Sequence, residues 1–160
     1  MKIQIAIIIL LIFTLIGFVK AESTGNEYGF ANAWFNGQEA TVKNVKLKIG
    51  EPGDIKVTVT SNISGHVIVG LTNPLVTKPY QVIEGTEIDE RIDNYNVPAG
   101  WSKTFSWRIK PNGAWKDGNA PINVLVTFYD TQSKKDKTIE FTIANPYILD
   151  EQYTDCFIFF

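Results

Sequence analysis

The sequence predicts an all-β protein: an immunoglobulin-like antiparallel β-sandwich of about seven to nine strands, preceded by a signal-peptide helix. Three observations support this fold class. Apolar and polar residues alternate with a period of two along most of the chain after residue 21. Turn-forming residues recur about every eight to twelve positions, and no amphipathic pattern continues beyond about two helical turns. A small closed barrel is the alternative architecture.

The N-terminus has the features of a secretion signal. A short basic start precedes an apolar run at residues 3–19, and Val19 and Ala21 occupy the positions where signal peptidase prefers small residues. We expect residues 1–21 to be a signal peptide and the protein to be secreted to the extracellular cell surface. The alternative is an uncleaved anchor, because the apolar run is near the lower limit for spanning a bilayer. We expect contact with the membrane only through this segment, if it is uncleaved.

The remaining composition describes one exported domain, long enough to bury a sizeable core. Removal of residues 1–21 also removes Lys2 and Lys20, which takes the formal net charge from −2 to −4. This acidity argues against a nucleic-acid partner, because phosphate binding depends on a basic surface. Cys156 is the only cysteine, so an intramolecular disulfide is impossible and the fold must depend on packing.

The first expected strands lie near the start of the domain. Residues 28–37 and 39–44 are typical of one or two short strands separated by Asn36-Gly37. Residues 45–49 and 55–61 both alternate. They flank a turn-forming "GEPGD" stretch, so they predict an antiparallel hairpin with one face in water.

The later strands follow the same alternation. In "SKTFSWRIK", Phe105, Trp107 and Ile109 share one face, so Trp107 is expected in the core. A polar "TQSKKD" loop predicts a hairpin between the last two strands. The expected strands of this part of the chain are residues 66–72, 80–85, 102–110, 122–130 and 137–145.

The domain limits follow from where the alternation begins and ends. We expect the β-sandwich domain at residues 22–147. Residues 148–160 form a C-terminal tail that breaks the pattern and ends in "CFIFF".

Three long stretches carry a family resemblance. They are "AWFNGQEATVKNVKLKIGEPGDIKVTVTS", "VPAGWSKTFSWRIKPNGAWKDGNAPINVLVTFYD" and "FTIANPYILDEQY". With them the chain resembles the sarcinarray (MAST-domain) family of secreted archaeal proteins over nearly the whole mature sequence. The resemblance implies an exported, surface-associated β domain and offers no catalytic residues to carry over. The sequence departs from the family pattern after Tyr153, where relatives continue into a spacer and an anchoring segment.

Candidate catalytic and metal-binding residues are few. His66 is the only histidine, and no G-x-S-x-G motif is present, so we predict that the protein is not an enzyme. The acidic stretch "IEGTEIDERIDNYN" is expected to be a solvated loop. Its Glu87, Asp89 and Asp93 offer the oxygen ligands that Ca²⁺ prefers, so a calcium site is the alternative. We expect no other cofactor.

One modification site and one possible binding surface remain. Asn62 begins the only N-x-S/T sequon, in a turn between strands, and is a predicted glycosylation site. Trp101 and Trp115 lie in turn-rich segments beside strands. We expect them to plug the open ends of the sandwich. The alternative is an exposed aromatic patch that they form with Trp34.

The sequence therefore favours a non-enzymatic extracellular β-sandwich with a structural or adhesive role at the archaeal cell surface. Its expected partners are other cell-envelope proteins or glycans. The alternative is a carbohydrate- or ligand-binding module that uses the loop aromatics Trp101 and Trp115.

Overall fold

A computed structural model describes residues 24–154. The predicted signal peptide, Cys156 and the terminal "FIFF" lie outside these residues. Residues 24–154 form thirteen strands and no helix. The strands are β1 (Thr24–Asn26), β2 (Gly29–Phe35), β3 (Gln38–Glu39), β4 (Lys46–Ile49), β5 (Gly53–Ser61), β6 (Gly65–Thr72), β7 (Tyr80–Glu84), β8 (Ile92–Val97), β9 (Ser102–Pro111), β10 (Gly118–Asn119), β11 (Ile122–Asp130), β12 (Lys135–Ala144) and β13 (Tyr147–Gln152).

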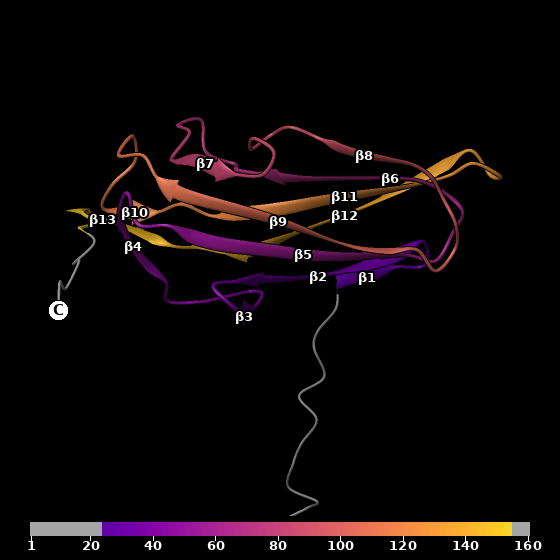
Figure 1. The fold of residues 1–160 in the computed structure, drawn as a ribbon, viewed down its shortest axis with the longest axis horizontal. Coiled ribbons are helices and arrows are strands. Elements are labelled where there is room, and N and C mark those ends of the chain that lie inside the picture. The colour runs from indigo at the N-terminus through magenta and orange to yellow at the C-terminus, as the bar shows by residue number, and fades with distance from the viewer. Residues whose placement is uncertain (1–23, 155–160) are drawn as a thin grey trace, which may run out of the picture.

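The strands form two long sheets and a small third sheet. Sheet A has the order β1-β2-β5-β9-β7, with β3 added beside β2, and sheet B has the order β12-β11-β6-β8. Sheet C, with the order β10-β13-β4, lies at one end of the long strands (Figure 1). Nine of the thirteen strands within residues 24–154 have five or more residues. The immunoglobulin-like β-sandwich predicted from the sequence is confirmed.

The alternation of apolar residues places the core between sheets A and B. In β5 the burial alternates residue by residue, and Ile55, Val57 and Val59 are fully buried. The inward residues of β9 and β11 belong to the same buried cluster. Burial of each such aliphatic side chain contributes about 1.5–3 kcal/mol. The two sheets approach closely at Gly29, where a Cβ atom would lie only 2.5 Å from the Phe128 ring.

A tight turn sets the position of β2. Asn36 and Gly37 both have positive φ, 49° and 77°, which is the geometry of a two-residue type I′ hairpin turn. The turn pairs Phe35 with Gln38 and Trp34 with Glu39. The Asn-Gly pair in the sequence therefore marks this turn correctly, although β3 is much shorter than the strand expected there.

The predicted hairpin of residues 45–49 with 55–61 is wrong. Both segments are strands, but β4 pairs in parallel with β13 in sheet C, while β5 lies in sheet A. The turn between β4 and β5 is hydrogen-bonded to a different strand, since Gly50 donates its N–H to the Pro111 carbonyl at the end of β9. Residues 147–152, most of which were assigned to the tail, form β13, and Ile148 is fully buried.

The acidic stretch also contains a strand that the sequence did not reveal. Residues 92–97 form β8, which pairs with β6 at the edge of sheet B. Asn94 stands where an apolar residue would have completed the alternation. Its side-chain amide donates hydrogen bonds to the Val67 and Ile92 carbonyls, at 3.2 and 3.3 Å. A polar residue satisfied in this way hides the strand pattern.

Trp107 has the core position that its phase predicts. The side chain is 3% exposed and stacks on Phe105 with ring centroids 6.3 Å apart. Gly85 covers the other side, since a Cβ atom there would lie 2.6 Å from the indole Cδ1. The lack of a side chain at Gly85 therefore leaves room for the Trp107 ring.

We predict that Trp107→Ala lowers the free energy of unfolding by about 3–5 kcal/mol, because it removes buried surface and leaves a cavity. Such a loss is a large part of a domain's total of about 5–15 kcal/mol. Denaturant unfolding of purified protein measures it. Ser106→Ala, on the same strand but exposed, is the control and should stay within about 0.5 kcal/mol of wild type. Equal midpoints for the Trp107→Ala and Ser106→Ala variants would contradict the packing described here.

Candidate ligand-binding groove on the outer face of sheet A

The outer face of sheet A presents side chains in cross-strand rows. In the central row, Trp34 of β2 lies opposite Lys56 of β5, and Lys56 lies opposite Ser106 of β9. Trp34 is outward because its neighbours Ala33 and Phe35 occupy the inward positions of β2, at 2% and 1% exposure. The register of the three strands thus places an indole, an ammonium group and a hydroxyl side by side in water.

The next row is charged. Asp54 of β5 lies opposite Arg108 of β9, and Glu84 of β7 lies opposite Arg108 on the other side. The Arg108 Nε atom is 3.8 Å from an Asp54 carboxylate oxygen, and the two side chains are 43% and 61% exposed. Asn36 closes this row at the β2 turn, where its Oδ1 accepts the Asp54 N–H at 2.8 Å. Arg108 is therefore flanked by two carboxylates on an open surface.

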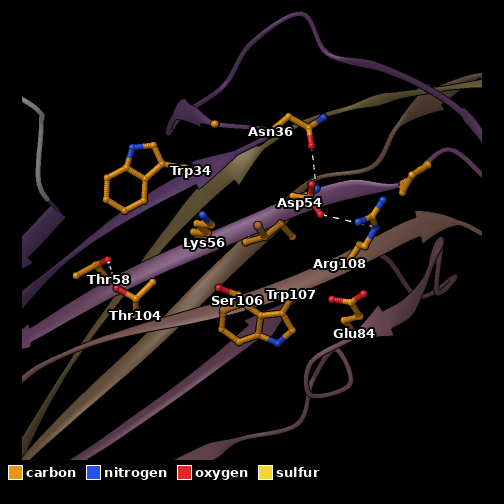
Figure 2. A pocket seen from close by; sticks show the side chains of 13 residues that line it. Trp34, Asn36, Asp54, Lys56, Thr58, Glu84, Thr104, Ser106, Trp107 and Arg108 are labelled. Carbon is orange, nitrogen blue, oxygen red and sulfur yellow. Dashed lines mark hydrogen bonds and ion pairs between the residues drawn. The ribbon is translucent and has the colours of Figure 1, made fainter.

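These two rows border a groove of about 950 Å³, which we call the Trp34 groove. It runs from the β2 turn and Pro52 to the Thr58–Thr104 pair. In Figure 2, Lys56 lies between the Trp34 indole and the Asp54–Arg108 pair. Trp34 is half-buried, and it is not one of the aromatic residues that pack against the core cluster. The Trp34 indole thus adds to the apolar lining that Pro52, Ile55 and Trp107 also provide, and charged and hydroxyl side chains border the rest of the groove.

Hydrogen bonds between hydroxyl groups fix the far end of this face. Thr58 and Thr104 share a hydrogen bond of 2.8 Å, and Thr60 and Ser102 share one of 3.0 Å. Lys56 and Glu84, in contrast, form no ion pair within residues 24–154. The hydroxyl groups at one end of the face therefore bond to each other, whereas Lys56 and Glu84 at the charged end can still form ion pairs or hydrogen bonds with a ligand.

Trp101 lies at one end of the sandwich. Its indole is half-buried against the core, 6.5 Å from the Phe105 ring between centroids. The chain around it is held by the buried Ser61, whose N–H donates to the Trp101 carbonyl at 2.9 Å.

Trp115 lies at the other end, beside sheet C. Its indole nitrogen is buried without a hydrogen-bond partner among the described residues, and the ring covers Gly118. The next residue, Lys116, donates a 2.8 Å hydrogen bond to the Asp150 carboxylate, which raises the pKa of the Lys116 ammonium group.

Trp101 and Trp115 stand at opposite ends of the ten-residue strand β9, on the order of 30 Å apart. The structure therefore does not bring Trp101, Trp115 and Trp34 together in one patch.

The three acidic residues considered for calcium come from two different segments of the described chain. Asp93 lies in β8 opposite Ile68, whereas Glu87 and Asp89 lie in the preceding loop. The Asp89 N–H donates to the Leu71 carbonyl at 2.8 Å. Within residues 24–154, no group of three or more His, Cys, Asp and Glu side chains is arranged to hold a metal ion.

His66 lies in an aromatic cluster on the outer face of sheet B. Its ring stacks on Tyr129 with centroids 5.7 Å apart, and it contacts the edge of Tyr95 at 5.1 Å. The His66 Nδ1 atom accepts the Asn96 N–H at 3.2 Å. These neighbours are aromatic rings and backbone, so His66 contributes packing to the outer surface of the sheet.

Asn62, the predicted glycosylation site, is exposed in the turn between β5 and β6. Its N–H donates to the Tyr28 carbonyl at 2.8 Å, and its side-chain amide reaches the Glu27 carbonyl at 3.5 Å. Within the part of the chain that the structure describes, only this long contact restrains the Asn62 side-chain amide.

Sequence analysis missed most of the groove, although signals for it were present. Lys56 and Arg108 stand in the outward phase of strands that were predicted correctly. Trp34 stands between two inward residues of β2. The sequence does not show that β2, β5, β9 and β7 are neighbours in this order, and only that order brings these side chains together.

Comparison with known protein families gives one assignment for the chain. The sequence profile of the MAST domain matches residues 25–156. The chain belongs to the MAST domain family. This match confirms the MAST-domain part of the resemblance that the three long stretches carry. Comparison with curated protein sequences gives no match.

Among solved structures, this MAST domain is similar to the ASH / PapD-like domain of human CEP192 (PapD-like domain 7). The two share 11% sequence identity and a TM-score of 0.47, and the likeness covers 86% of this chain and 97% of that chain. Residues 24–154 of the MAST domain include no helix with the length and apolar character needed to cross a membrane.

We predict that Trp34→Phe lowers the acrylamide quenching of tryptophan fluorescence, because it removes an indole on the open face. Trp107→Phe is the matched control and should raise the mean quenching, because it removes an indole that is 3% exposed. Stern–Volmer slopes of the two variants and wild type measure the difference. An unchanged slope for Trp34→Phe would contradict the outward position of this side chain.

Proposed function

We propose that this MAST domain is a non-enzymatic extracellular module with a structural or adhesive role at the cell surface. It acts through surface contacts, and the Trp34 groove is its contact surface. One observation supports this most strongly: an indole faces outward in the middle of a polar sheet, beside Lys56, which has no ion-pair partner among residues 24–154. Tryptophan and arginine are the residues most enriched at the energetic centres of protein interfaces.

The side chains of the groove suit binding better than catalysis. A glycosidase acid needs an apolar pocket that keeps its carboxyl group protonated. Asp54 and Glu84 instead flank the Arg108 guanidinium on an exposed surface. His66, which a Ser-His pair would require, stacks on Tyr129 on the other sheet.

The cell-surface location is supported by the sequence. The apolar run at residues 3–19, with Val19 and Ala21 at the positions that signal peptidase recognises, is typical of an exported protein. The resemblance to sarcinarray proteins suggests an archaeal surface, with other envelope proteins or glycans as partners. A binding module that uses Trp101 and Trp115 is less well supported, because both indoles pack against the core at opposite ends of β9.

We predict that fluorescently labelled protein of residues 22–160 binds saturably to isolated envelopes of the source cells. Trp34→Ala should weaken this binding about tenfold or more, as the loss of a central interface residue does. Tyr95→Ala is the control, since it removes an aromatic side chain that is 67% exposed on the outer face of sheet B. Thermal unfolding checks that both variants are folded. If Tyr95→Ala abolishes binding and Trp34→Ala does not, the proposed contact surface is wrong.

We also propose that Asn62 is glycosylated. Its exposed turn lies six residues along the strand from Lys56, on the order of 20 Å away, so a glycan there would leave the groove open. Mass spectrometry of protein from native envelopes should find the Asn62 peptide with an added glycan mass, and Asn62→Gln should remove it. Recovery of only the unmodified peptide would refute this proposal.

A further inference from the structure

The Trp34 groove combines an apolar ring with charged groups that surround it. The Trp34 indole borders one part of the groove, and Arg108 and Asp54 border another (Figure 2). Lys56, between them, is directly opposite Trp34 in the sheet. Small-ligand sites have this composition: an apolar surface with a few polar groups that fix orientation. The volume of about 950 Å³ is at the upper end of the usual range for such sites.

The charges of the groove cancel. Two cationic side chains, Lys56 and Arg108, and two anionic ones, Asp54 and Glu84, border it. The two carboxylates would repel a polyanion, and the ammonium and guanidinium groups would repel a cationic ligand. Because complementary potentials decide which partners are tolerated, this balance favours a neutral ligand. The groove nonetheless offers many hydrogen-bond donors and acceptors, which favours a ligand rich in hydroxyl groups.

The hydrogen-bonding groups at the charged end are largely available. The 3.8 Å between Arg108 and Asp54 exceeds a hydrogen-bond distance, so the guanidinium donors and the carboxylate acceptors are not used by each other. Asn36 contacts the Asp54 backbone, so the only contact of the Asp54 carboxylate among the described residues is this long ion pair with Arg108. Planar groups such as guanidinium and carboxylate make paired hydrogen bonds. Adjacent hydroxyl groups on a sugar ring present a matching pair of donors and acceptors.

The indole provides the complementary apolar contact. One face of a pyranose ring carries mainly C–H groups, and these pack on the flat face of an aromatic ring. Trp34 offers such a face in a fixed position, because β2 is paired on both sides, with β1 and β3 on one edge and β5 on the other. The strand pairing holds the backbone of the binding residues in place, so binding orders only exposed side chains such as Lys56 and Arg108.

We infer that the Trp34 groove binds a neutral glycan. One sugar ring stacks on the Trp34 indole, and its hydroxyl groups hydrogen-bond to Arg108, Asp54 and Lys56. This inference rests on the proposed function, because it names the ligand of the same contact surface.

Periodate oxidation of the envelopes tests the glycan directly, because it cleaves the vicinal diols of sugars. Labelled wild-type protein should bind oxidised envelopes about tenfold or more weakly than untreated envelopes, in line with the loss of a central contact. The Trp34→Ala variant, already weakened, should show no further loss on oxidation. The Tyr95→Ala variant should respond as wild type does.

Soluble probes then test the charge argument. Neutral manno-, gluco- and galacto-oligosaccharides are titrated against heparin and polygalacturonate, with tryptophan fluorescence as the readout. Arg108→Lys keeps the positive charge but loses the planar fork, so it should weaken binding of a neutral oligosaccharide severalfold. Preferential binding of either polyanion would overturn the inference of a neutral ligand.

The outcomes separate the two proposals. If wild-type protein binds oxidised envelopes undiminished but loses binding after protease treatment, the partner is a protein. The glycan inference then fails while the groove remains the contact surface. If Trp34→Ala binds untreated envelopes as wild type does, the proposed function fails, whatever the ligand.

Discussion

The dry interface between sheets A and B is the interaction on which the other features of this MAST domain depend. Val57 and Val59 of sheet A and Val67 and Val69 of sheet B are completely buried. The chain has a single cysteine, so no disulfide within it can supply stability in place of this burial. Within residues 24–154, Ser61 is the only fully buried polar residue, and its hydroxyl donates to the Ile63 carbonyl at 2.8 Å. Two further polar groups belong to buried core residues: the Tyr80 hydroxyl, which donates to the Ala120 carbonyl at 2.6 Å, and the Trp107 indole nitrogen, which has no partner among the described residues.

The same alternation that fills the interface determines what the two outer faces can do. Each inward residue has an outward neighbour, so the side chains on the solvent face are held by strands whose positions the core fixes. Sheet A uses this face for the Trp34 groove, and sheet B carries the cluster of His66, Tyr95 and Tyr129. At the ends of the sandwich, Trp101 and Trp115 cover the core instead. Aromatic side chains in the middle of the strands therefore lie on the outer faces, whereas those at the ends of the sandwich cover the core.

The long strands could be predicted from the sequence, because their period of two is local. Which strands pair could not. The alternation in β4 identifies a strand equally well whether its partner is β5 or, as observed, β13. β8 was missed because Asn94 fills an inward position with backbone hydrogen bonds instead of apolar surface. For the groove, the outward phase of Lys56 and Arg108 is visible in the sequence, but their proximity to Trp34 depends on the strand order.

The outward position of Trp34 has two physical explanations of unequal strength. Favourable cross-strand pairs, such as two aromatic residues, stabilise a sheet by about 0.2–1 kcal/mol, and the pair of Trp34 with Lys56 contributes no more than this. Full burial of a large apolar side chain contributes about 1.5–3 kcal/mol, and a one-residue shift of β2 would turn Trp34 inward. That shift would also turn Ala31, Ala33 and Phe35 outward and leave the core facing side chains that do not fit it. The core therefore fixes the register of β2, and this register keeps the Trp34 indole on the outer face of sheet A.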